Sequence, residues 1–305
     1  MRNVIYEEHM EGIAIDRIAR DYEYTMFSKH THDEYEIYYL IEGQRYYFIE
    51  NQTYHVKKGD LVFINRNLIH KTGQFEKSYH ERALIEFADY PFSSFLATTG
   101  ELSLSSFFKQ NQIILPLNQR EQKYVLVLFD GIADELRQRR PGFQMMTMTK
   151  LARLFFFALR FKHNPELNSS SILSTSAAHQ RVTEVASYIT ANYATVDSLE
   201  QVAAHFYISK SYLSRIFKHV TGYTVNEYIN VNRVQQARTL LSHTNLSITE
   251  IAHRLGYNSI TYFEKIFRKH TETSPLKYRK RATKSNDPTR PKSFDDTVPE
   301  DLLEH

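Results

Sequence analysis

The clearest hydrophobic pattern in the chain runs from residue 248 to residue 279, where apolar positions recur at helical spacing. Gly256 interrupts the pattern, and Asn258 or Ser259 can cap the start of a second helix. Pro275 can open a third, basic helix. The apolar positions of the first two helices are Ile248, Ile251, Ala252, Leu255, Tyr262, Phe263, Ile266 and Phe267. The pattern therefore predicts two short helices around a tight turn.

Nearly the same pattern occurs about 50 residues earlier, between residues 199 and 222. Both segments have the order apolar, Ala, turn, Ser, aromatic and Ile-Phe-basic, and the Ile-Phe-basic triplets begin at Ile216 and Ile266. Residues 225–241 between them predict one long helix. Two helix-turn-helix units joined by one helix can place two recognition helices in successive major grooves, which lie about 34 Å apart.

The N-terminal part has a different period. Residues 1–24 indicate an opening strand or arm, and residues 24–95 form short aromatic and β-branched runs separated by turns. Residues 36–50 predict a hairpin with Gly43 near its turn, and residues 60–72 predict a strand followed by a bend. Many short strands at this spacing favour a β-barrel or jelly roll.

Helical spacing returns between residues 118 and 162, with Pro141-Gly142 separating two predicted helices. The second helix is unusually apolar, so we expect this pair to pack on the barrel and to supply a dimer seam. Residues 163–178 are rich in Ser and Asn and predict a linker, and residues 284–305 predict a disordered tail. The expected architecture is α+β with two domains, residues 1–162 and residues 179–283.

Composition and charge indicate the compartment of the protein and the class of its partner. The chain has 305 residues with 42% hydrophobic content and no cysteine, which excludes disulfides, zinc fingers and a cysteine nucleophile. It shows neither a signal-peptide pattern nor an apolar run of membrane-spanning length, so we expect a cytoplasmic protein that does not enter membranes. Residues 179–283 hold 14 Lys and Arg against 7 Asp and Glu, a net +7, and the whole chain carries +3. A basic C-terminal third favours contact with nucleic acid.

A second candidate chemistry lies in the β-rich part. His30, His32 and Glu36 share one parity on an extended chain, and His70 follows on another predicted strand. Such a set can hold a divalent metal. Its spacing resembles the two metal-binding motifs of the cupin superfamily. The second motif is incomplete, since Asn65 and Asn67 replace its usual Pro and Gly and Gln74 replaces its final Asn.

Three interpretations of this cluster stay open. The residues can hold a divalent metal, they can line a small-molecule pocket, or they can be polar groups satisfied within the barrel mouth. The pocket candidates are His30, His32, Glu36, Tyr38, Arg45, His70 and Arg82. With the metal interpretation, a metal-dependent cupin enzyme or a metal-sensing regulator is the alternative function.

The C-terminal helices carry a dense set of motif residues, namely Ile251-Ala252, Leu255-Gly256-Tyr257, Ser259, Tyr262-Phe263, Phe267-Arg268-Lys269, Ser274-Pro275 and Tyr278-Arg279. With this set, residues 182–281 resemble the AraC/XylS family of bacterial transcription regulators. The barrel followed by two helices is also similar to the sensor and dimerisation domain of that family. The resemblance implies a homodimeric regulator, an activator that works with RNA polymerase and is controlled by a small effector such as a carbohydrate. It implies no catalytic residue and no required cofactor.

By the same match, the second helix of each unit supplies the side chains that reach base edges. The candidates are Ser211, Ser214 and Arg215 in the first unit, and Ile260, Thr261, Tyr262 and Lys265 in the second. Arg215 can bind guanine O6 and N7 with two hydrogen bonds, whereas Lys265 can donate less rigidly. The expected phosphate contacts are Ser209, Lys210, Lys218, Arg254, Ser259, Arg268, Lys269 and Lys277. Arg215 is therefore the stronger candidate for sequence specificity.

Overall fold

The computed structural model describes most of the chain, namely residues 1–22, 33–75, 79–97, 103–104, 107–108, 114–161 and 177–285. The chain divides into two compact parts. One comprises Met1–Ser187 with Ser214–Tyr223, and the other comprises Tyr188–Leu213 with Thr224–His305. The predicted α+β class is confirmed, because strands occupy the N-terminal part and helices the C-terminal part.

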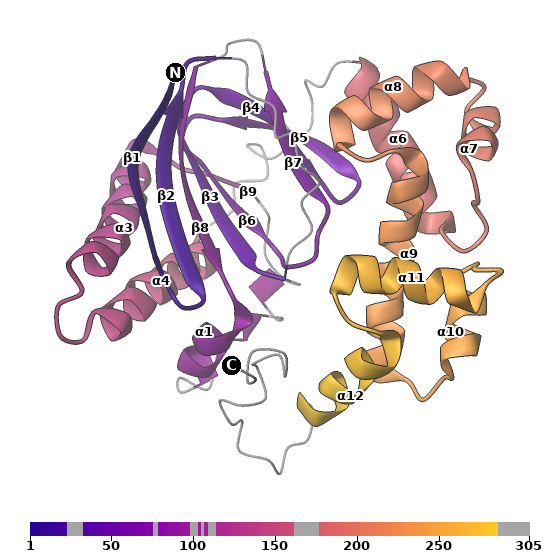
Figure 1. The fold of residues 1–305 in the computed structure, drawn as a ribbon. Coiled ribbons are helices and arrows are strands. Elements are labelled where there is room, and N and C mark those ends of the chain that lie inside the picture. The colour runs from indigo at the N-terminus through magenta and orange to yellow at the C-terminus, as the bar shows by residue number, and fades with distance from the viewer. Residues whose placement is uncertain are drawn as a thin grey trace. The chain divides into compact units, whose positions relative to one another are not determined.

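The N-terminal strands form two antiparallel sheets (Figure 1). The larger sheet has the strand order β1-β2-β8-β3-β6-β9, and the smaller has the order β5-β4-β7. The bounds are β1 (Arg2–Met10), β2 (Ile13–Arg20), β3 (Tyr35–Glu42), β4 (Gln44–Ile49), β5 (Gln52–Lys57), β6 (Asp60–Ile64), β7 (His70–Gln74), β8 (His80–Phe87) and β9 (Ile114–Pro116).

The two faces of the larger sheet bury different partners, because successive side chains of a strand point to opposite faces. Ile37 and Tyr39 of β3 join the main hydrophobic core, to which Phe129 and Phe155 of the helices also belong. Tyr38 and Leu40 join a second cluster that includes Tyr47, Ile49 and Val56 of the smaller sheet. The sheets therefore enclose an interior of their own, separate from the core beneath the helices.

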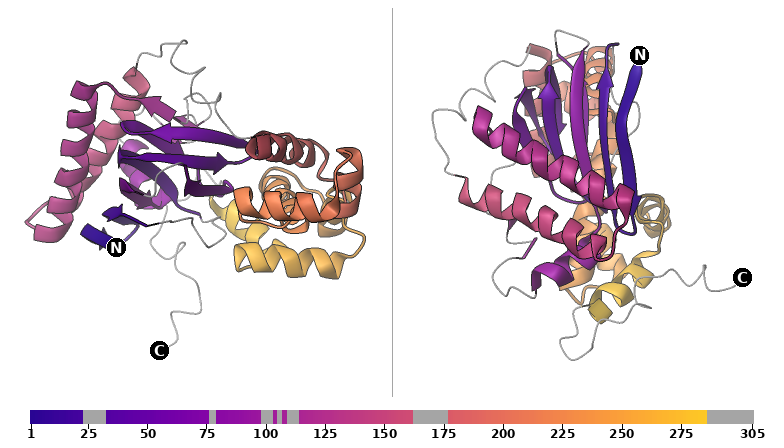
Figure 2. Two further views of the ribbon diagram at one scale, coloured as in Figure 1. Left: turned by 90° about the horizontal axis from the view of Figure 1, so that it is seen from above. Right: turned by 90° about the vertical axis from the view of Figure 1, so that its left-hand side faces the viewer.

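Helices α1 (Asp89–Ala97), α3 (Gln119–Gln138) and α4 (Phe143–Arg160) accompany the sheets. In Figure 2, α3 and α4 lie across one face of the larger sheet. Asn118 begins α3 with a capping box that involves Glu121, and α4 begins after Gly142. The predicted pair of helices between residues 118 and 162, separated at Pro141-Gly142, is confirmed.

Two local predictions are wrong. Residues 36–50 do form two strands around Gly43, whose φ is +93°, but these strands are not a hairpin. β3 pairs with β6 and β8, whereas β4 pairs with β5 and β7, because the chain crosses from one sheet to the other at the turn. The β pattern also stops earlier than residue 95. Residues 89–97 are helical, since Phe92 and Leu96 are buried at the spacing of one helical turn.

The C-terminal helices follow the predicted order. Their bounds are α6 (Ala177–Asn192), α7 (Leu199–His205), α8 (Lys210–Thr221), α9 (Val225–His243), α10 (Ile248–Arg254), α11 (Ile260–Thr271) and α12 (Pro275–Ser285). α6 begins inside the predicted linker, most of which lies outside the described residues, as does the predicted tail beyond residue 285. Within the described part of the chain, no helix is both long and apolar enough to cross a membrane.

Candidate functional site

The first helix-turn-helix consists of α7 and α8. The Oγ atom of Ser198 caps α7 by accepting from the backbone N–H of Gln201 (3.2 Å). The turn closes when the N–H of Ile208 donates to the carbonyl oxygen of Ala203 (3.0 Å). The Oγ atom of Ser209 then accepts from the N–H of Tyr212 (3.2 Å), which starts α8. Serine caps therefore define both helix starts.

The second helix-turn-helix consists of α10 and α11 and repeats these contacts. Ser247 caps α10 in a capping box with Glu250. The N–H of Tyr257 donates to Ala252 (3.0 Å) to close the turn, and the Oγ atom of Ser259 accepts from Tyr262 (3.3 Å) to start α11. The structure thereby decides the choice that the sequence left open, because Ser259 rather than Asn258 caps α11.

The repeat extends beyond the recognition helices. The hydroxyl of Thr221 donates to the carbonyl oxygen of Phe217 (2.7 Å), and that of Thr271 donates to Phe267 (2.8 Å). Thr224 caps α9 after the first unit, and the Oγ atom of Ser274 accepts from the N–H of Lys277 after the second. The duplicated block therefore includes the start of the helix that follows each unit.

The side chains predicted to read bases lie on accessible faces of α8 and α11. All of them are exposed except Ser214, which is half-buried. Thr261 and Lys265 are one helical turn apart, as are Ser211 and Arg215, so each pair occupies one helix face. Each unit thus presents a short row of side chains that can reach into a groove.

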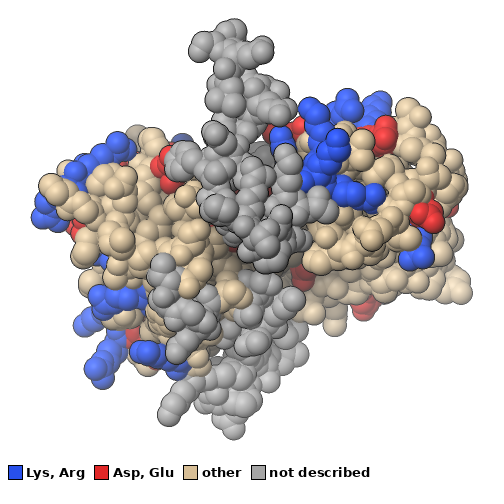
Figure 3. Space-filling model, turned by 90° about the horizontal axis from the view of Figure 1, so that it is seen from below, with Lys and Arg blue, Asp and Glu red and all other residues tan. Residues whose placement is uncertain are grey.

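The predicted phosphate contacts are exposed as well: Ser209, Lys210, Lys218, Arg254, Ser259, Arg268, Lys269 and Lys277. Figure 3 shows Lys and Arg side chains gathered on the visible face of the C-terminal helices, with fewer Asp and Glu among them. Lys210 also forms a surface ion pair with Glu200 (3.1 Å). A basic, exposed surface of this kind suits a polyanionic partner.

The space between the two sheets is the candidate ligand site. Its described residues line a small cavity of about 30 Å³, which has room for water but not for a sugar. The lining residues are Arg20, Glu36, Tyr38, Tyr47, Thr72, His80, Arg82 and Leu84. Of the predicted pocket residues, Glu36, Tyr38 and Arg82 reach this cavity, while His30 and His32 lie outside the described residues. Arg45 is buried but is not among the lining residues.

The interior is polar and charged although it is buried. The Oε1 atom of Glu36 lies 2.9 Å from Nε2 of His70, and the hydroxyl of Tyr47 lies 3.5 Å from Oε2 of Glu36. Burial and the Glu36 carboxylate raise the pKa of Tyr47, so its phenol stays neutral and remains a donor. Arg82 pairs with Asp16, and burial lowers the pKa of Arg82 to about 10, which leaves it charged at neutral pH.

Arg20 and His80 were missed from the sequence, although they line the same cavity. They are direct neighbours on β2 and β8, whose register pairs Arg20 with His80. Tyr47 and Thr72 are paired in the same way on β4 and β7. Both pairings join segments that are far apart in sequence, so no local pattern marks them. Only their alternation with apolar neighbours could have suggested that they point inward.

The proposed metal site stays a prediction. Glu36 and His70 are close enough to bind the same metal ion, as that hypothesis requires. His30 and His32, the other two proposed ligands, lie outside the described residues. Among the residues that the structure does describe, no group of three or more His, Asp or Glu side chains is arranged to hold a metal ion.

Models of known protein families match segments in both halves of the chain. Residues 202–281 match the model of a helix-turn-helix domain, and residues 12–85 match the model of an AraC-like ligand binding domain. The chain belongs to the AraC family of regulators. The match to the second model covers β2 to β8, the strands that enclose the polar interior.

Individual relatives agree with this assignment. The uncharacterized HTH-type transcriptional regulator YijO of Escherichia coli is 34% identical over 149 residues, which are 49% of this chain and 53% of that protein. YdeC of Bacillus subtilis, another uncharacterized HTH-type transcriptional regulator, is 23% identical over 82% of this chain and 85% of its own. The Xylose operon regulatory protein of Escherichia coli is 40% identical over 27% of this chain and 21% of its own. The chain thus spans about half the length of YijO.

The matched domains and relatives are those of transcriptional regulators and not of enzymes. The metal-dependent enzyme considered from the sequence is therefore set aside for this AraC-family chain. A metal-sensing regulator is compatible with the same comparisons.

Proposed function

We propose that this AraC-family chain is a DNA-binding transcription regulator controlled by a small molecule. In this proposal residues 179–283 bind double-stranded DNA, and residues 1–162 bind the effector and form a homodimer. The observation that carries the proposal is the pair of helices, α8 and α11, that follow matching capped turns and expose the predicted base-reading side chains. We place the protein in the cytoplasm, away from membranes, as an activator that works with RNA polymerase.

The effector is proposed to bind between the two sheets, and a carbohydrate is the preferred class. The polar lining supports this choice, because hydroxyl groups need donors and acceptors such as Glu36, Tyr38 and Arg82. A relative whose name is Xylose operon regulatory protein supports it as well, although the match covers 27% of this chain. Since the cavity is smaller than a sugar, binding would require the lining side chains to move.

Dimerisation is proposed to use the helix pair between residues 118 and 162. Val127 and Met145 are 69% and 60% exposed, and Met146 and Leu159 are also exposed on these helices. Exposed apolar side chains on two neighbouring helices favour a contact with another copy. Sedimentation of the full chain would check this, and a monomer at micromolar concentration would contradict it.

The DNA-binding proposal is tested by in vitro selection from a random duplex library with the full chain. We expect two enriched segments whose centres lie about one helical turn, roughly 10 base pairs, apart for each bound chain. Enrichment of a single short segment, or no enrichment, would contradict bipartite recognition.

The effector proposal is tested by thermal shift of the full chain with neutral pentoses, hexoses and sugar acids. A binding sugar should raise the melting temperature, and Tyr38→Phe should weaken the shift because it removes a hydroxyl from the cavity wall. A flat response across the panel would count against a carbohydrate.

The alternative, a metal-sensing regulator, rests on the proximity of Glu36 and His70. Elemental analysis of the purified full chain, beside a His32→Ala variant, separates it from the carbohydrate proposal. One metal ion per chain that is lost in the variant would favour metal sensing. Metal-free protein that binds a sugar would end that alternative.

A further inference from the structure

Arg233 occupies an unexpected place in the middle of α9. The spacing of apolar residues puts it among the polar positions of that helix, yet only 6% of its surface is exposed. A buried guanidinium is costly unless several acceptors surround it. The identity of those acceptors shows what Arg233 holds together.

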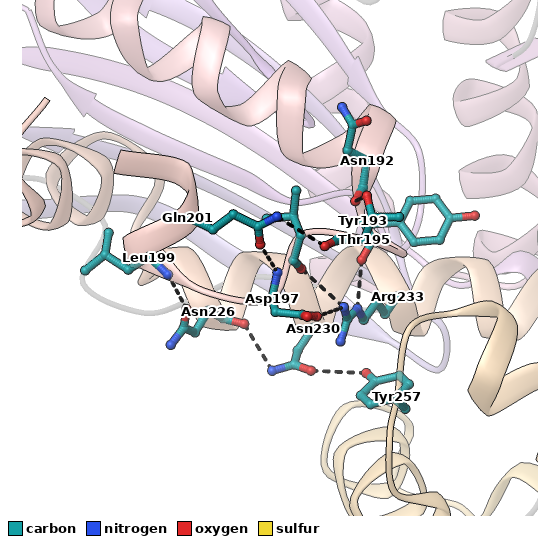
Figure 4. Close-up of polar contacts among 11 residues, drawn as sticks. Asn192, Tyr193, Thr195, Asp197, Leu199, Gln201, Asn226, Asn230, Arg233 and Tyr257 are labelled. Carbon is teal, nitrogen blue, oxygen red and sulfur yellow. Dashed lines mark hydrogen bonds and ion pairs between the residues drawn. The ribbon is translucent and has the colours of Figure 1, made fainter. Parts of the chain in front are cut away.

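The first group of acceptors belongs to the loop that leads into α7. The Nε atom of Arg233 donates to the carbonyl oxygen of Tyr193 (2.8 Å), and Nη2 donates to that of Val196 (3.2 Å). Nη2 also pairs with Oδ1 of Asp197 (2.9 Å). Figure 4 shows these contacts converging on one side chain. Arg233 therefore fastens the entry of the first helix-turn-helix to α9.

The second group belongs to the turn between α10 and α11. The Cζ atom of Arg233 lies 5.0 Å from the centre of the Tyr257 ring, a cation–π distance. The hydroxyl of Tyr257 donates to Oδ1 of Asn230 (3.1 Å), another side chain of α9. Burial raises the pKa of Tyr257, so this phenol keeps its proton and its role as donor.

Gly256 brings the two groups together. Its φ is +78°, and a Cβ atom there would overlap the carbonyl oxygen of Ala194 and lie 2.8 Å from Nη2 of Arg233. The turn of the second helix-turn-helix therefore sits directly against the loop of the first, with the guanidinium beside both. Tyr193 from that loop also packs against the hydrophobic cluster of the second unit.

A short polar chain on α9 supports the same junction. The N–H of Leu199, the first residue of α7, donates to Oδ1 of Asn226 (3.1 Å). The Nδ2 atom of Asn230 donates to the carbonyl oxygen of Asn226 (3.0 Å), and Asn230 in turn accepts from Tyr257. Contacts from α9 thus reach the start of α7 on one side and the α10–α11 turn on the other.

We propose that Arg233 is a positioning residue that fixes the separation of the two helix-turn-helix units, so that the protein accepts its two DNA half-sites at one spacing only. The inference rests on the proposed DNA-binding function. When the first of two rigidly joined modules is bound, the second has a high effective concentration at a site at one separation. With a loose joint, this effective concentration is lower and is spread over many separations. Loss of Arg233 should therefore change how affinity depends on spacing, and not the contacts of either unit with bases.

The test compares the full-length wild type with Arg233→Met, which keeps the length and loses the donors. Duplexes carry the selected site with its native spacing or with one or two base pairs added or removed. We expect the wild type to lose about tenfold or more in affinity on each change, and Arg233→Met to lose about threefold or less. At native spacing the variant should bind about tenfold more weakly, and single half-sites should be bound equally by both proteins.

Arg238→Met is the matched control. Arg238 lies on the same helix and also donates to a backbone carbonyl, but its acceptor is His270 at the end of α11 (3.1 Å). This variant should keep the spacing penalty of the wild type, which is the loss of affinity when the spacing between the half-sites is changed. If Arg233→Met does not fold by circular dichroism, Asp197→Ala replaces it, because Asp197 is exposed and its loss removes one acceptor only. It should lower the spacing penalty in the same direction by a smaller factor.

A measurement without DNA separates this inference from the function on which it rests. The chain has no cysteine, so Ala204→Cys on α7 and Glu264→Cys on α11, both exposed, give two unique spin-label sites. The distribution of label distances should be narrow in the wild type and with Arg238→Met, and broad with Arg233→Met. A folded Arg233→Met protein, or its Asp197→Ala replacement, with wild-type spacing penalty and a narrow distribution would overturn the proposal. If the wild type selects no bipartite site, the DNA function fails and the label distances alone decide the role of Arg233.

Discussion

The two helix-turn-helix units share their caps and turn closures, but they place different residues at the strained position of the turn. In the first unit this position is Tyr207, a residue with φ of +54° that is 95% exposed. In the second unit it is Gly256, with φ of +78° and the carbonyl oxygen of Ala194 directly beside it. The backbone requirement is the same in both turns, and only the surroundings differ.

Position 256 therefore requires glycine because of packing more than because of the turn. A non-glycine residue pays a modest cost at positive φ, which Tyr207 shows to be tolerable in solvent. At Gly256 a side chain would have to displace the loop of the other unit. The second turn is therefore a junction between units, whereas the first is a surface turn.

Exchange of these turn residues should have the largest effect. Gly256→Ala should destabilise the protein by about 2–3 kcal/mol, because it adds both strain at positive φ and an overlap with Ala194. Tyr207→Ala is the matched control and should change stability by about 0.5 kcal/mol or less. Urea unfolding of both variants measures the difference, and similar losses in the two would refute the role of packing.

For base reading, we expect the first helix-turn-helix to be more sensitive to substitution than the second, which is the reverse of the expectation for the turns. Arg215→Ala should cost about 1–3 kcal/mol of binding and relax specificity at one base pair, if it binds guanine through two hydrogen bonds. Lys265→Ala should cost about 1 kcal/mol or less, because a single ammonium is a weaker base reader. Anisotropy titrations with the selected site and its single-base variants measure both.

Arg181→Ala serves as control for Arg215→Ala. Arg181 is a half-buried arginine on α6 that pairs with Glu184 (2.8 Å) and has no predicted base contact. It should leave discrimination between bases unchanged. Unchanged discrimination with Arg215→Ala as well would remove Arg215 from the base-reading set.

The helix caps offer a smaller contrast. Ser247→Ala should cost about 1 kcal/mol of stability and Ser198→Ala slightly less, because only Ser247 has a reciprocal capping box. Hydrogen bonds from Ser247 lower the pKa of Glu250 in that box, so this cap is complete above the usual glutamate range and weakens as the pH falls through the lowered value. Thermal unfolding at neutral pH and at pH 3 compares the two, and a larger loss with Ser198→Ala would contradict the assignment.

The smallest expected effect concerns phosphate contacts, where the units should behave alike. Lys218 and Arg268 stand at equivalent positions and are both exposed. Alanine at either should weaken binding to every sequence similarly and reduce the slope of log affinity against log salt by about 1. Titrations at several salt concentrations give the slopes, and a clear difference between the variants would show that the units lie on DNA unequally.

Local sequence patterns were sufficient to predict the C-terminal helices and the repeat that they form. The spacing of apolar residues predicted α7, α8, α10 and α11, because the buried face of a helix follows from its own periodicity. Strand pairing was harder. The predicted hairpin at Gly43 is wrong because the choice between a hairpin and a crossing to another sheet depends on strands that follow later in the chain.

The candidate sites divide in the same way. The exposed positions of Arg215 and Lys265 could be predicted from the sequence, because a helical face is set by spacing alone. Their base-reading role is what the family resemblance implies. Arg20 and His80 could not, since they meet through the register of two distant strands. Arg233 could not either, because a lone arginine on a long helix normally lies in solvent.

From the sequence alone follow the α+β class and the two helix-turn-helix units, both of which depend on contacts within about one helical turn or one strand. The tertiary structure decided which polar residues are buried. It placed Glu36 and Arg82 beside the same cavity as Arg20, and it enclosed Arg233 between Tyr193 and Tyr257. Burial of a charge is set by all the segments that surround it, and those segments are brought together only by the fold.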